Sequence, residues 1–226
     1  QRALLERRAA DPRVVVIRDD RPFNFSALCN RAAEVASGER LLLLNDDVWV
    51  REPDWLDRML AAAEPEAVGV VGALLLYPDE TIQHAGVALG PGGCAGHPLR
   101  GRPFAELRAD ANLAGRRSAV TAACMLVKTA LWRRLGGMDE RAFPVTLNDV
   151  DFCLRAEATG AAVVFEPSAV LWHLEGQSRP SDLAPERRAA RAREIAAFRD
   201  RWPEAVRDDP WGSPALTRAD ESGDPR

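Results

Sequence analysis

The sequence predicts an α/β fold in which helices cover both faces of a mainly parallel sheet. Two apolar runs, "RLLLL" at 40–44 and "AVGVVGALLLYP" at 67–78, are continuous, as in strands that are buried on both faces. Helix-like segments alternate with these strands, which is the order typical of parallel sheets. Ligands of such sheets bind beyond the carboxyl ends of the strands, so we expect a functional site at that edge.

Each remaining element is predicted from its own pattern. In chain order these are a helix at 2–10, a β-branched strand at 13–20, helices at 24–38 and 53–64, a strand running into a short helix at 118–137, a helix at 147–160, a strand or pair of strands at 161–176, and an amphipathic helix at 184–202. Between 79 and 115 glycine and proline are frequent, which predicts a hairpin and long loops over the sheet. We expect one domain over 1–212 and a polar tail over 213–226.

The helix at 24–38 carries its own start signal and a predicted buried face. Leu28, Ala32 and Val35 recur at helical spacing, so we expect them to face the core. Asn24 or Ser26 can cap the first turn by accepting a backbone hydrogen bond.

Composition excludes several classes of protein. Hydrophobic residues make up 46% and charged residues 28% of the 226 residues, which is ordinary for a soluble globular protein. A net charge of −4 argues against a general nucleic-acid binder. No apolar run approaches the roughly 18 residues of a membrane span. The cysteines lack CxxC spacing, which favours reduced thiols in a cytosolic protein: Cys29, Cys94, Cys124 and Cys153.

Two adjacent carboxylates follow the leucine run, where a core strand should end. Asp46 and Asp47, with Asn45 before them, offer hard oxygen ligands suited to Mg²⁺ or Mn²⁺ and leave coordination positions open for phosphate oxygens. A solvated turn at the end of the strand is the structural alternative. Their position at a strand's carboxyl end favours a functional role.

A second polar cluster opens the helix at 147–160. Asp149 and Asp151 are two residues apart and so diverge on a helix; one can face a cleft while the other serves the helix start. For Asp151 a purely structural role in the first turn is an equal alternative. His173 ends a predicted strand and is structural unless it faces the carboxylates, where an imidazole can complete a metal site. For His84 and His97 a structural role outweighs a ligand role.

Taken together, these stretches resemble family 2 glycosyltransferases of the GT-A fold, and most closely bacterial enzymes of rhamnosyltransferase type that build O-antigen and other surface polysaccharides. The matching blocks occur in the expected order over nearly the whole chain: "NFSALCNRAAEVASGERLLLLNDDV", "GALLLYPDETIQHAGVALG", "AGHPLRG", "SAVTAACMLVKTALWRRLGGMDE", "LNDVDFCLR", "WHLEGQSR" and "DDPWGSPAL".

The resemblance implies a role for each site residue. Asp47 matches the metal-binding acid of the family's DxD motif, and His173 a histidine at the metal and diphosphate. Asn45 and Asp46 are implied to contact the donor ribose or phosphates, with Asn45 replacing the motif's first acid. Asp149 matches the general base of the (E/N)DxD block, and Asp151 of the same block is grouped with the donor-binding residues.

The implied activity is metal-dependent, inverting transfer of a sugar from a UDP- or dTDP-sugar to a hydroxyl of a glycan or lipid-linked acceptor in surface polysaccharide synthesis. Mn²⁺ or Mg²⁺ is the implied cofactor. No nucleic-acid partner is expected, and the implied location is the cytoplasm, with room for peripheral attachment to the inner face of the cytoplasmic membrane.

One departure from the family leaves alternatives open. The family's opening strand of type "VSIVIPT", and the next strand with its base-reading aspartate, are not found in the chain, which begins at Gln1. We therefore expect a glycosyltransferase domain that is partial at its N-terminus. A non-catalytic binding fragment is one alternative, and a metal-dependent α/β phosphohydrolase is another. An "IPT"-type strand encoded upstream would favour the enzyme, and phosphomonoester hydrolysis would favour the phosphohydrolase.

Overall fold

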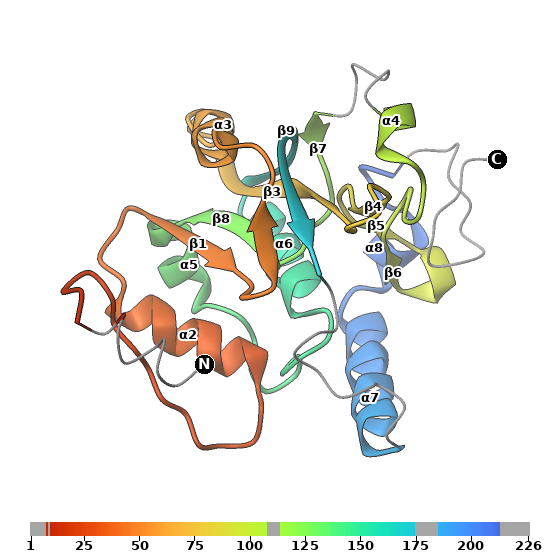
Figure 1. The fold of residues 1–226 in the computed structure, drawn as a ribbon. Coiled ribbons are helices and arrows are strands. Elements are labelled where there is room, and N and C mark those ends of the chain that lie inside the picture. The colour runs from red at the N-terminus through yellow and green to blue at the C-terminus, as the bar shows by residue number, and fades with distance from the viewer. Residues whose placement is uncertain (1–7, 9, 108–113, 175–184, 213–226) are drawn as a thin grey trace.

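The computed structural model describes residues 8, 10–107, 114–174 and 185–212, and its centre is a seven-stranded sheet with the order β1-β8-β3-β9-β2 (Figure 1). On this sheet β4 pairs with β3 and β7 pairs with β9. The strands are β1 (Arg40–Leu44), β2 (Val48–Val50), β3 (Val68–Leu76), β4 (Ile82–His84), β7 (Gly115–Arg116), β8 (Cys124–Lys128) and β9 (Ala162–His173). A separate hairpin joins β5 (Ala88–Leu89) to β6 (Ala95–Gly96).

The predicted α/β fold is confirmed, but the prediction of a mainly parallel sheet is wrong. Among the described strands, β3 and β9 form a parallel pair, whereas β1 with β8, β8 with β3, and β2 with β9 run antiparallel. The chain reaches β8 only after the long segment at 79–115, and β8 then enters between β1 and β3 in the opposite direction. Continuous apolar runs indicate burial on both faces of a strand and carry no information on its direction.

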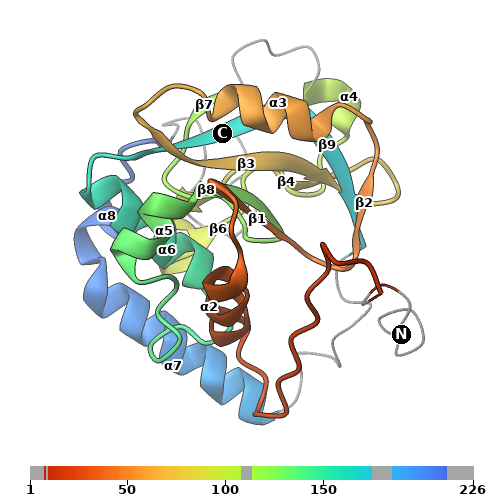
Figure 2. The same ribbon diagram turned by 90° about the vertical axis from the view of Figure 1, so that its left-hand side faces the viewer.

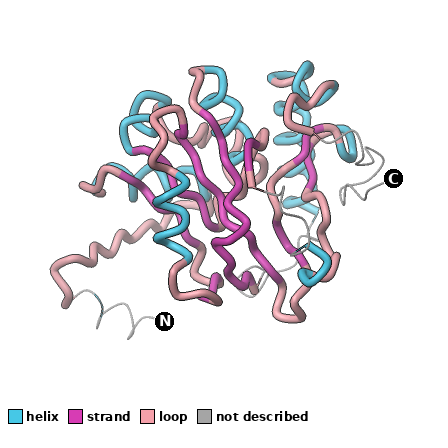
Figure 3. Tube along the Cα trace, turned by 90° about the horizontal axis from the view of Figure 1, so that it is seen from above, coloured by secondary structure: helices cyan, strands magenta, loops and turns pink. Residues whose placement is uncertain are grey.

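Helices cover both faces of the sheet, as predicted (Figure 2). α3 packs on one face, and α5 and α6 pack on the other (Figures 1 and 2). Seen from above, the strands form one central layer with helices outside it (Figure 3). The helices are α2 (Phe25–Val35), α3 (Trp55–Ala62), α4 (Phe104–Leu107), α5 (Thr129–Leu135), α6 (Asn148–Ala158), α7 (Pro185–Arg201) and α8 (Pro203–Arg207), with a 3₁₀ turn η1 (Pro91–Gly93).

β3 divides the core into two layers. All nine of its residues are buried, and alternate side chains point to opposite faces. Val71 and Leu75 pack with Met59 of α3, whereas Val70 and Leu74 belong to the layer beneath α5 and α6. The predicted burial of this strand on both faces is therefore confirmed.

The leucine run of β1 is less buried than the sequence predicted. Leu41 is buried, but Leu42 and Leu43 are half-buried and Leu44 is 46% exposed. The reason is position, because β1 lies at one end of the strand order and pairs only with β8 among the described strands. Apolar content alone does not show whether a strand is central or at an edge.

Two further predictions for the N-terminal part are wrong. Residues 13–20 belong to no strand, and Val15 is 65% exposed, because a β-branched run forms a strand only where a partner strand is available. The predicted buried face of α2 is also displaced, since Val35 is 55% exposed. Instead Asn30 donates to the carbonyl of Met138 and accepts from its N–H, both at 2.9 Å. These polar contacts set which face of α2 packs inward.

Most of the remaining elements match their predictions. Asn24 caps α2 by accepting from Ala27 N at 2.9 Å, and left-handed Gly136 ends α5. Phe198 of α7 is fully buried, with Ile195 and Trp202 packed against the same core. Within 79–107, where a hairpin and loops were expected, many residues are buried and β4 pairs with the sheet. Most of the predicted helix at 2–10 and the tail at 213–226 lie outside the described residues.

The structure also answers two questions raised by composition. The four cysteines are free, and burial raises the pKa of Cys29 to about 12, with some help from the nearby charge of Asp149. Within the described ranges, no helix is both long and apolar enough to cross a membrane.

Candidate active site

The candidate site lies at one end of the sheet, where β1 and β9 finish and β8 begins. Residues 45–47 form a turn that joins β1 to β2, closed by a hydrogen bond from Val48 N to the carbonyl of Asn45. Asn45 N donates to the carbonyl of Ala123 at 3.0 Å, and Leu174 N donates to the carbonyl of Asp47 at 3.0 Å. The turn is thus tied both to the segment before β8 and to the end of β9.

Asp47 and His173 meet at this edge of the sheet. His173 Nε2 lies 3.1 Å from Asp47 Oδ1, and the two side chains are only 7% and 14% exposed. Antiparallel pairing of β2 with β9 places Val48 opposite His173, which brings the preceding aspartate to the imidazole. His173 Nδ1 is buried and has no hydrogen-bond partner among the described residues. The two residues assigned to the metal from sequence are therefore in direct contact.

The other two residues of the acidic turn differ in exposure. Asn45 Nδ2 lies 3.5 Å from His173 Nε2, so the amide borders the Asp47–His173 pair. Asp46 is exposed at the tip of the turn. An exposed carboxylate beside a buried pair can accept hydrogen bonds from hydroxyl groups of a ligand that enters from solvent.

Asp149 lies in the first turn of α6 and is anchored to the same segment. Its Oδ2 accepts a hydrogen bond from Ala122 N at 3.1 Å, and its Oδ1 accepts from Val150 N at 2.9 Å. Ala122 directly precedes Ala123, whose carbonyl binds the turn of the acidic residues. Asp149 and the turn are consequently attached to neighbouring residues of one short backbone segment.

Asp151 does not join this group. Its side chain is fully buried, with Oδ2 2.8 Å from Arg155 Nε and Oδ1 2.9 Å from an Arg201 nitrogen. Trp202 Nε1 donates to the same Oδ1 at 3.0 Å. With both oxygens engaged inside the protein, the carboxylate links α6 to α7. For Asp151 this geometry favours the structural alternative over donor binding.

A divalent metal fits the Asp47–His173 pair. Two ligands each about 2.1 Å from Mg²⁺ and at a right angle to one another lie about 3 Å apart, close to the separation of the two atoms. The described residues contain no group of three His, Cys, Asp or Glu side chains that could hold an ion. Two protein ligands are enough where substrate phosphates and water complete the shell, as is usual for Mg²⁺.

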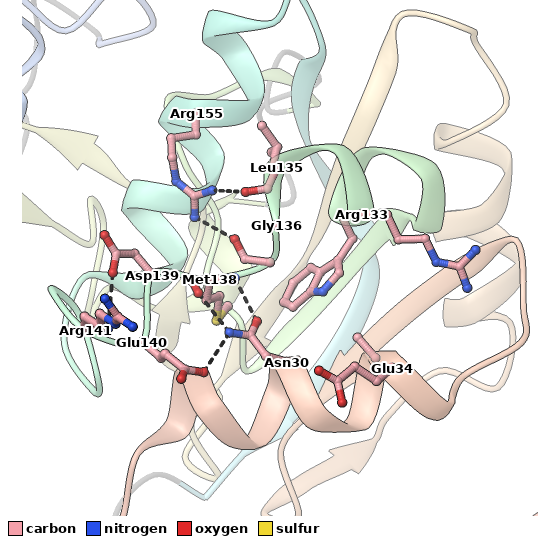
Figure 4. Close-up of a pocket in the computed structure, with 13 residues that line it drawn as sticks. Asn30, Glu34, Arg133, Leu135, Gly136, Met138, Asp139, Glu140, Arg141 and Arg155 are labelled. Carbon is pink, nitrogen blue, oxygen red and sulfur yellow. Dashed lines mark hydrogen bonds between the residues drawn. The ribbon is translucent and has the colours of Figure 1, made fainter.

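A separate cavity of about 740 Å³ lies between α2 and the connection from α5 to α6 (Figure 4). Arg155 of α6 and Asn30 of α2 point toward the α5–α6 connection from opposite sides, and Arg155 donates to the carbonyls of Leu135 and Gly137. Neither the acidic turn nor Asp149 nor His173 lines it. Its polar groups hold the α5–α6 connection together, so it is not the candidate site.

Comparison with known proteins decides the family. Residues 4–196 match the family model described as "Glycosyltransferase like family 2". The chain belongs to this glycosyltransferase family.

Two curated relatives are similar over nearly all of this glycosyltransferase chain. It is 44% identical over 213 residues to the uncharacterized protein y4gI of Sinorhizobium fredii, which covers 92% of the chain and 23% of that protein. It is 41% identical over 222 residues to the O-antigen biosynthesis protein RfbC of Myxococcus xanthus, covering 95% of the chain and 17% of that protein. The chain thus spans less than a quarter of the length of either relative.

Solved structures of glycosyltransferases share the fold. GalNAc-T7, determined with UDP, GalNAc and Mn²⁺, superposes with a TM-score of 0.63 at 16% identity, covering 94% of this chain and 44% of that one. The mannosyltransferase PcManGT of Pyrobaculum calidifontis, with GDP-Man and Mn²⁺, gives 0.56 at 16% identity, covering 92% of this chain and 52% of that one. These neighbours confirm the predicted GT-A fold.

Sequence reasoning did not indicate two contacts in and near the candidate site. The Thr121–Ala123 segment lies within the matching block "SAVTAACMLVKTALWRRLGGMDE", but nothing in that block indicated that its backbone holds both Asp149 and the acidic turn. The other contact is made by Glu194 of α7, which is 5% exposed and accepts from Val145 N and Thr146 N at 3.0 and 2.7 Å, and so holds the segment that leads into α6. In the sequence Glu194 is one acidic residue of a charged helix, which did not indicate a buried role.

Proposed function

We propose that this domain transfers a sugar from a nucleoside-diphosphate sugar to a hydroxyl group of a glycan or lipid-linked acceptor, with inversion at the anomeric carbon. The observation that carries the proposal is the contact between Asp47 and His173, together with an Asp149 held by the backbone segment that also binds the acidic turn. This arrangement would supply a cation site for a diphosphate and a carboxylate that can accept a proton.

Donor binding is assigned to the acidic turn. Asp47 and His173 would hold Mg²⁺ or Mn²⁺, and charge that develops on the leaving diphosphate is neutralised by this ion when it is bound. Asp46 and Asn45 would contact the ribose or the phosphates, since the first is exposed at the turn and the second borders the metal pair. The two structural neighbours were determined with UDP or GDP-Man and Mn²⁺, which supports a donor of this class.

Asp149 is assigned the role of general base. An acceptor hydroxyl is a weak nucleophile at neutral pH, so its proton must pass to a base as its oxygen attacks. In the proposed step this proton moves to the carboxylate of Asp149, the new bond forms at the anomeric carbon, and the bond to the diphosphate breaks on the opposite side. The two backbone N–H groups on the carboxylate fix its orientation before the acceptor arrives.

Surface polysaccharide synthesis is the proposed setting. The similarity to the O-antigen biosynthesis protein RfbC supports it, and the resemblance to rhamnosyltransferase-type enzymes makes a dTDP-sugar one candidate donor. We assign the reaction to the cytoplasm, at the inner face of the cytoplasmic membrane, where lipid-linked acceptors are available.

A donor screen on the full-length protein that contains this chain tests the proposal. UDP-, GDP- and dTDP-sugars are titrated by calorimetry with Mn²⁺ or with EDTA, and products formed with glycan and lipid-linked acceptors are identified by mass spectrometry. We expect one donor to bind only with metal and to be consumed with an acceptor. If a donor binds equally well in Mn²⁺ and in EDTA and no sugar is transferred, the proposal is contradicted and a non-catalytic binding module is favoured. Release of phosphate without an acceptor would favour a phosphohydrolase.

A further inference from the structure

His84 and His97 form a hydrogen-bonded pair outside the metal and base positions. His84 ends β4 and is fully buried, while His97 follows β6 and is half-buried. Their Nδ1 atoms lie 2.9 Å apart, so one ring must donate and the other accept. Which ring donates, and so the direction of the bond, depends on the protonation of the other nitrogen of His84, Nε2.

The backbone decides that direction. His84 Nε2 lies 3.3 Å from the backbone N–H groups of Gly86 and of Thr121, and both groups are donors. Nε2 must therefore be unprotonated, which places the proton of a neutral His84 on Nδ1. His84 then donates to His97 Nδ1, and a neutral His97 carries its own proton on Nε2. One chain of hydrogen bonds fixes both tautomers.

The hydrogen bond to Thr121 connects this pair to the proposed active site. Thr121 begins the Thr121–Ala123 segment, in which Ala122 N donates to Asp149 and the carbonyl of Ala123 accepts from Asn45 N. The Thr121 hydroxyl also accepts from Ala123 N at 3.3 Å, which closes the segment on itself. His84 thus fixes one end of a backbone segment whose next two residues hold the proposed base and the acidic turn.

We propose that His84 is a positioning residue for sugar transfer, acting through the Thr121–Ala123 segment, and that His97 keeps it in the tautomer able to accept from Thr121. The inference rests on the proposed function, because it concerns the placement of Asp149 relative to the metal-binding turn. Displacement of a reacting group by about 1 Å can lower a rate about 100-fold. Loss of the hydrogen bond to Thr121 therefore affects turnover more than donor binding.

The groups around His84 favour its neutral form. His97, His173 and Arg117 interact with it electrostatically, and the Arg117 guanidinium lies over the ring of Phe165. Burial, followed by these electrostatic interactions, holds the pKa of His84 well below its usual value. A neutral imidazole is the form that the two backbone donors require.

Kinetics on the full-length protein test the inference. His84→Leu removes the acceptor, and His84→Gln restores one, because Gln Oε1 occupies nearly the same place as His Nε2. We expect His84→Leu to lower kcat about 10- to 100-fold with donor Kd within about twofold of wild type, and His84→Gln to recover most of the loss. Leu89→Ala, at a buried residue of the neighbouring β5, serves as a control for destabilisation alone.

Two results would overturn the inference. One is an unchanged kcat in folded His84→Leu protein, and the other is a loss in Leu89→Ala as large as that in His84→Leu with no recovery by His84→Gln. A wild-type protein that transfers sugar from none of the donors would instead overturn the proposed function, and this inference with it. The two failures are thus distinguishable.

Nitrogen-15 NMR of the imidazole rings supplies a readout that is independent of activity. We expect His84 as the Nδ1–H tautomer and His97 as the Nε2–H tautomer at pH 7.5. His97→Leu removes the acceptor for His84 Nδ1–H, so we expect a mixture of His84 tautomers and a lower kcat. His97→Asn keeps an acceptor near the place of Nδ1, so we expect the Nδ1–H tautomer of His84 and kcat to stay as in the wild type. An Nε2–H tautomer or a doubly protonated ring at His84 in the wild type would show that Thr121 is not held as described.

Discussion

His173 Nε2 lies 3.1 Å from Asp47 Oδ1, although 126 residues separate the two in sequence. The contact depends on β2, a strand of three residues that pairs with the end of β9 and places the acidic turn against the imidazole. A short strand at the sheet margin therefore assembles the proposed metal site.

Replacing either partner of this contact should weaken metal-dependent donor binding. Replacing a residue that only hydrogen-bonds to a metal ligand lowers metal affinity about 10- to 100-fold. Because Asp47→Ala and His173→Ala remove the proposed ligands themselves, we expect each to raise the donor Kd in Mn²⁺ by at least about tenfold. Titration calorimetry with and without EDTA measures this. Asp57→Ala, which removes an exposed carboxylate of α3, is the matched control. Equal donor affinity in Asp47→Ala and Asp57→Ala protein would refute the metal assignment.

Asp149→Asn should separate turnover from binding. The amide keeps an acceptor for the N–H of Ala122 but cannot take a proton, so we expect donor affinity to stay near that of the wild type while kcat falls about 100-fold or more. Single-turnover measurements on enzyme saturated with donor test this. If donor affinity falls and turnover of bound donor is spared, Asp149 serves the donor and the base is another residue.

Asp151→Ala should reduce stability rather than affinity. The change leaves Arg155 and Arg201 without their buried carboxylate, and removing one partner of a buried pair costs about 3–5 kcal/mol. We expect the lower part of that range, because the side chain of Arg201 is about one-third exposed. Urea unfolding measures the loss, and donor titration of the folded variant provides the comparison. Selective loss of donor binding at unchanged stability would restore Asp151 to the site.

The buried His84 should make stability depend on pH. Its pKa is held well below 6.5 in the folded protein by burial and then by electrostatic interaction with His97, His173 and Arg117, whereas in the unfolded chain it returns to about 6.5. Below pH about 6.5 the unfolded state therefore binds a proton at His84 that the folded state does not bind. The contribution of His84 is complete above pH about 6.5 and is lost as the pH falls toward the folded pKa, at up to about 1.4 kcal/mol per pH unit.

Urea unfolding at pH 7.5 and 5.5 measures this contribution. His84→Gln removes the titrating group, so its free energy of unfolding should change less between the two pH values than that of the wild type. The difference between the two proteins isolates His84 from His97 and His173, which both retain. Identical pH dependence in the two proteins would mean that the pKa of His84 is the same in the folded and the unfolded protein, which would contradict the prediction.

Several features of the fold follow from local sequence alone. Asn24 caps α2 as predicted because capping requires only a side-chain oxygen within the first turn. Gly136 ends α5 because the left-handed backbone there suits a residue without Cβ. β3 is buried along its whole length because nine apolar residues in succession cannot all be shielded on one face. The motif blocks also predicted the GT-A fold and named Asp47, Asp149 and His173.

The sequence by itself therefore determined most of the helices, the buried strand β3 and the residue types that could supply the chemistry, since caps, periodicity and apolar runs act within a few residues. Only the tertiary structure decided the direction of β8 relative to its neighbours, the edge position of β1 and the face by which α2 packs, because these depend on partners more than 50 residues away. The same holds for the site. Asp149 and Asp151 are two residues apart and look alike in sequence, yet Asp149 accepts from the backbone of Ala122 and Asp151 pairs with Arg201, so packing places the two carboxylates in different surroundings.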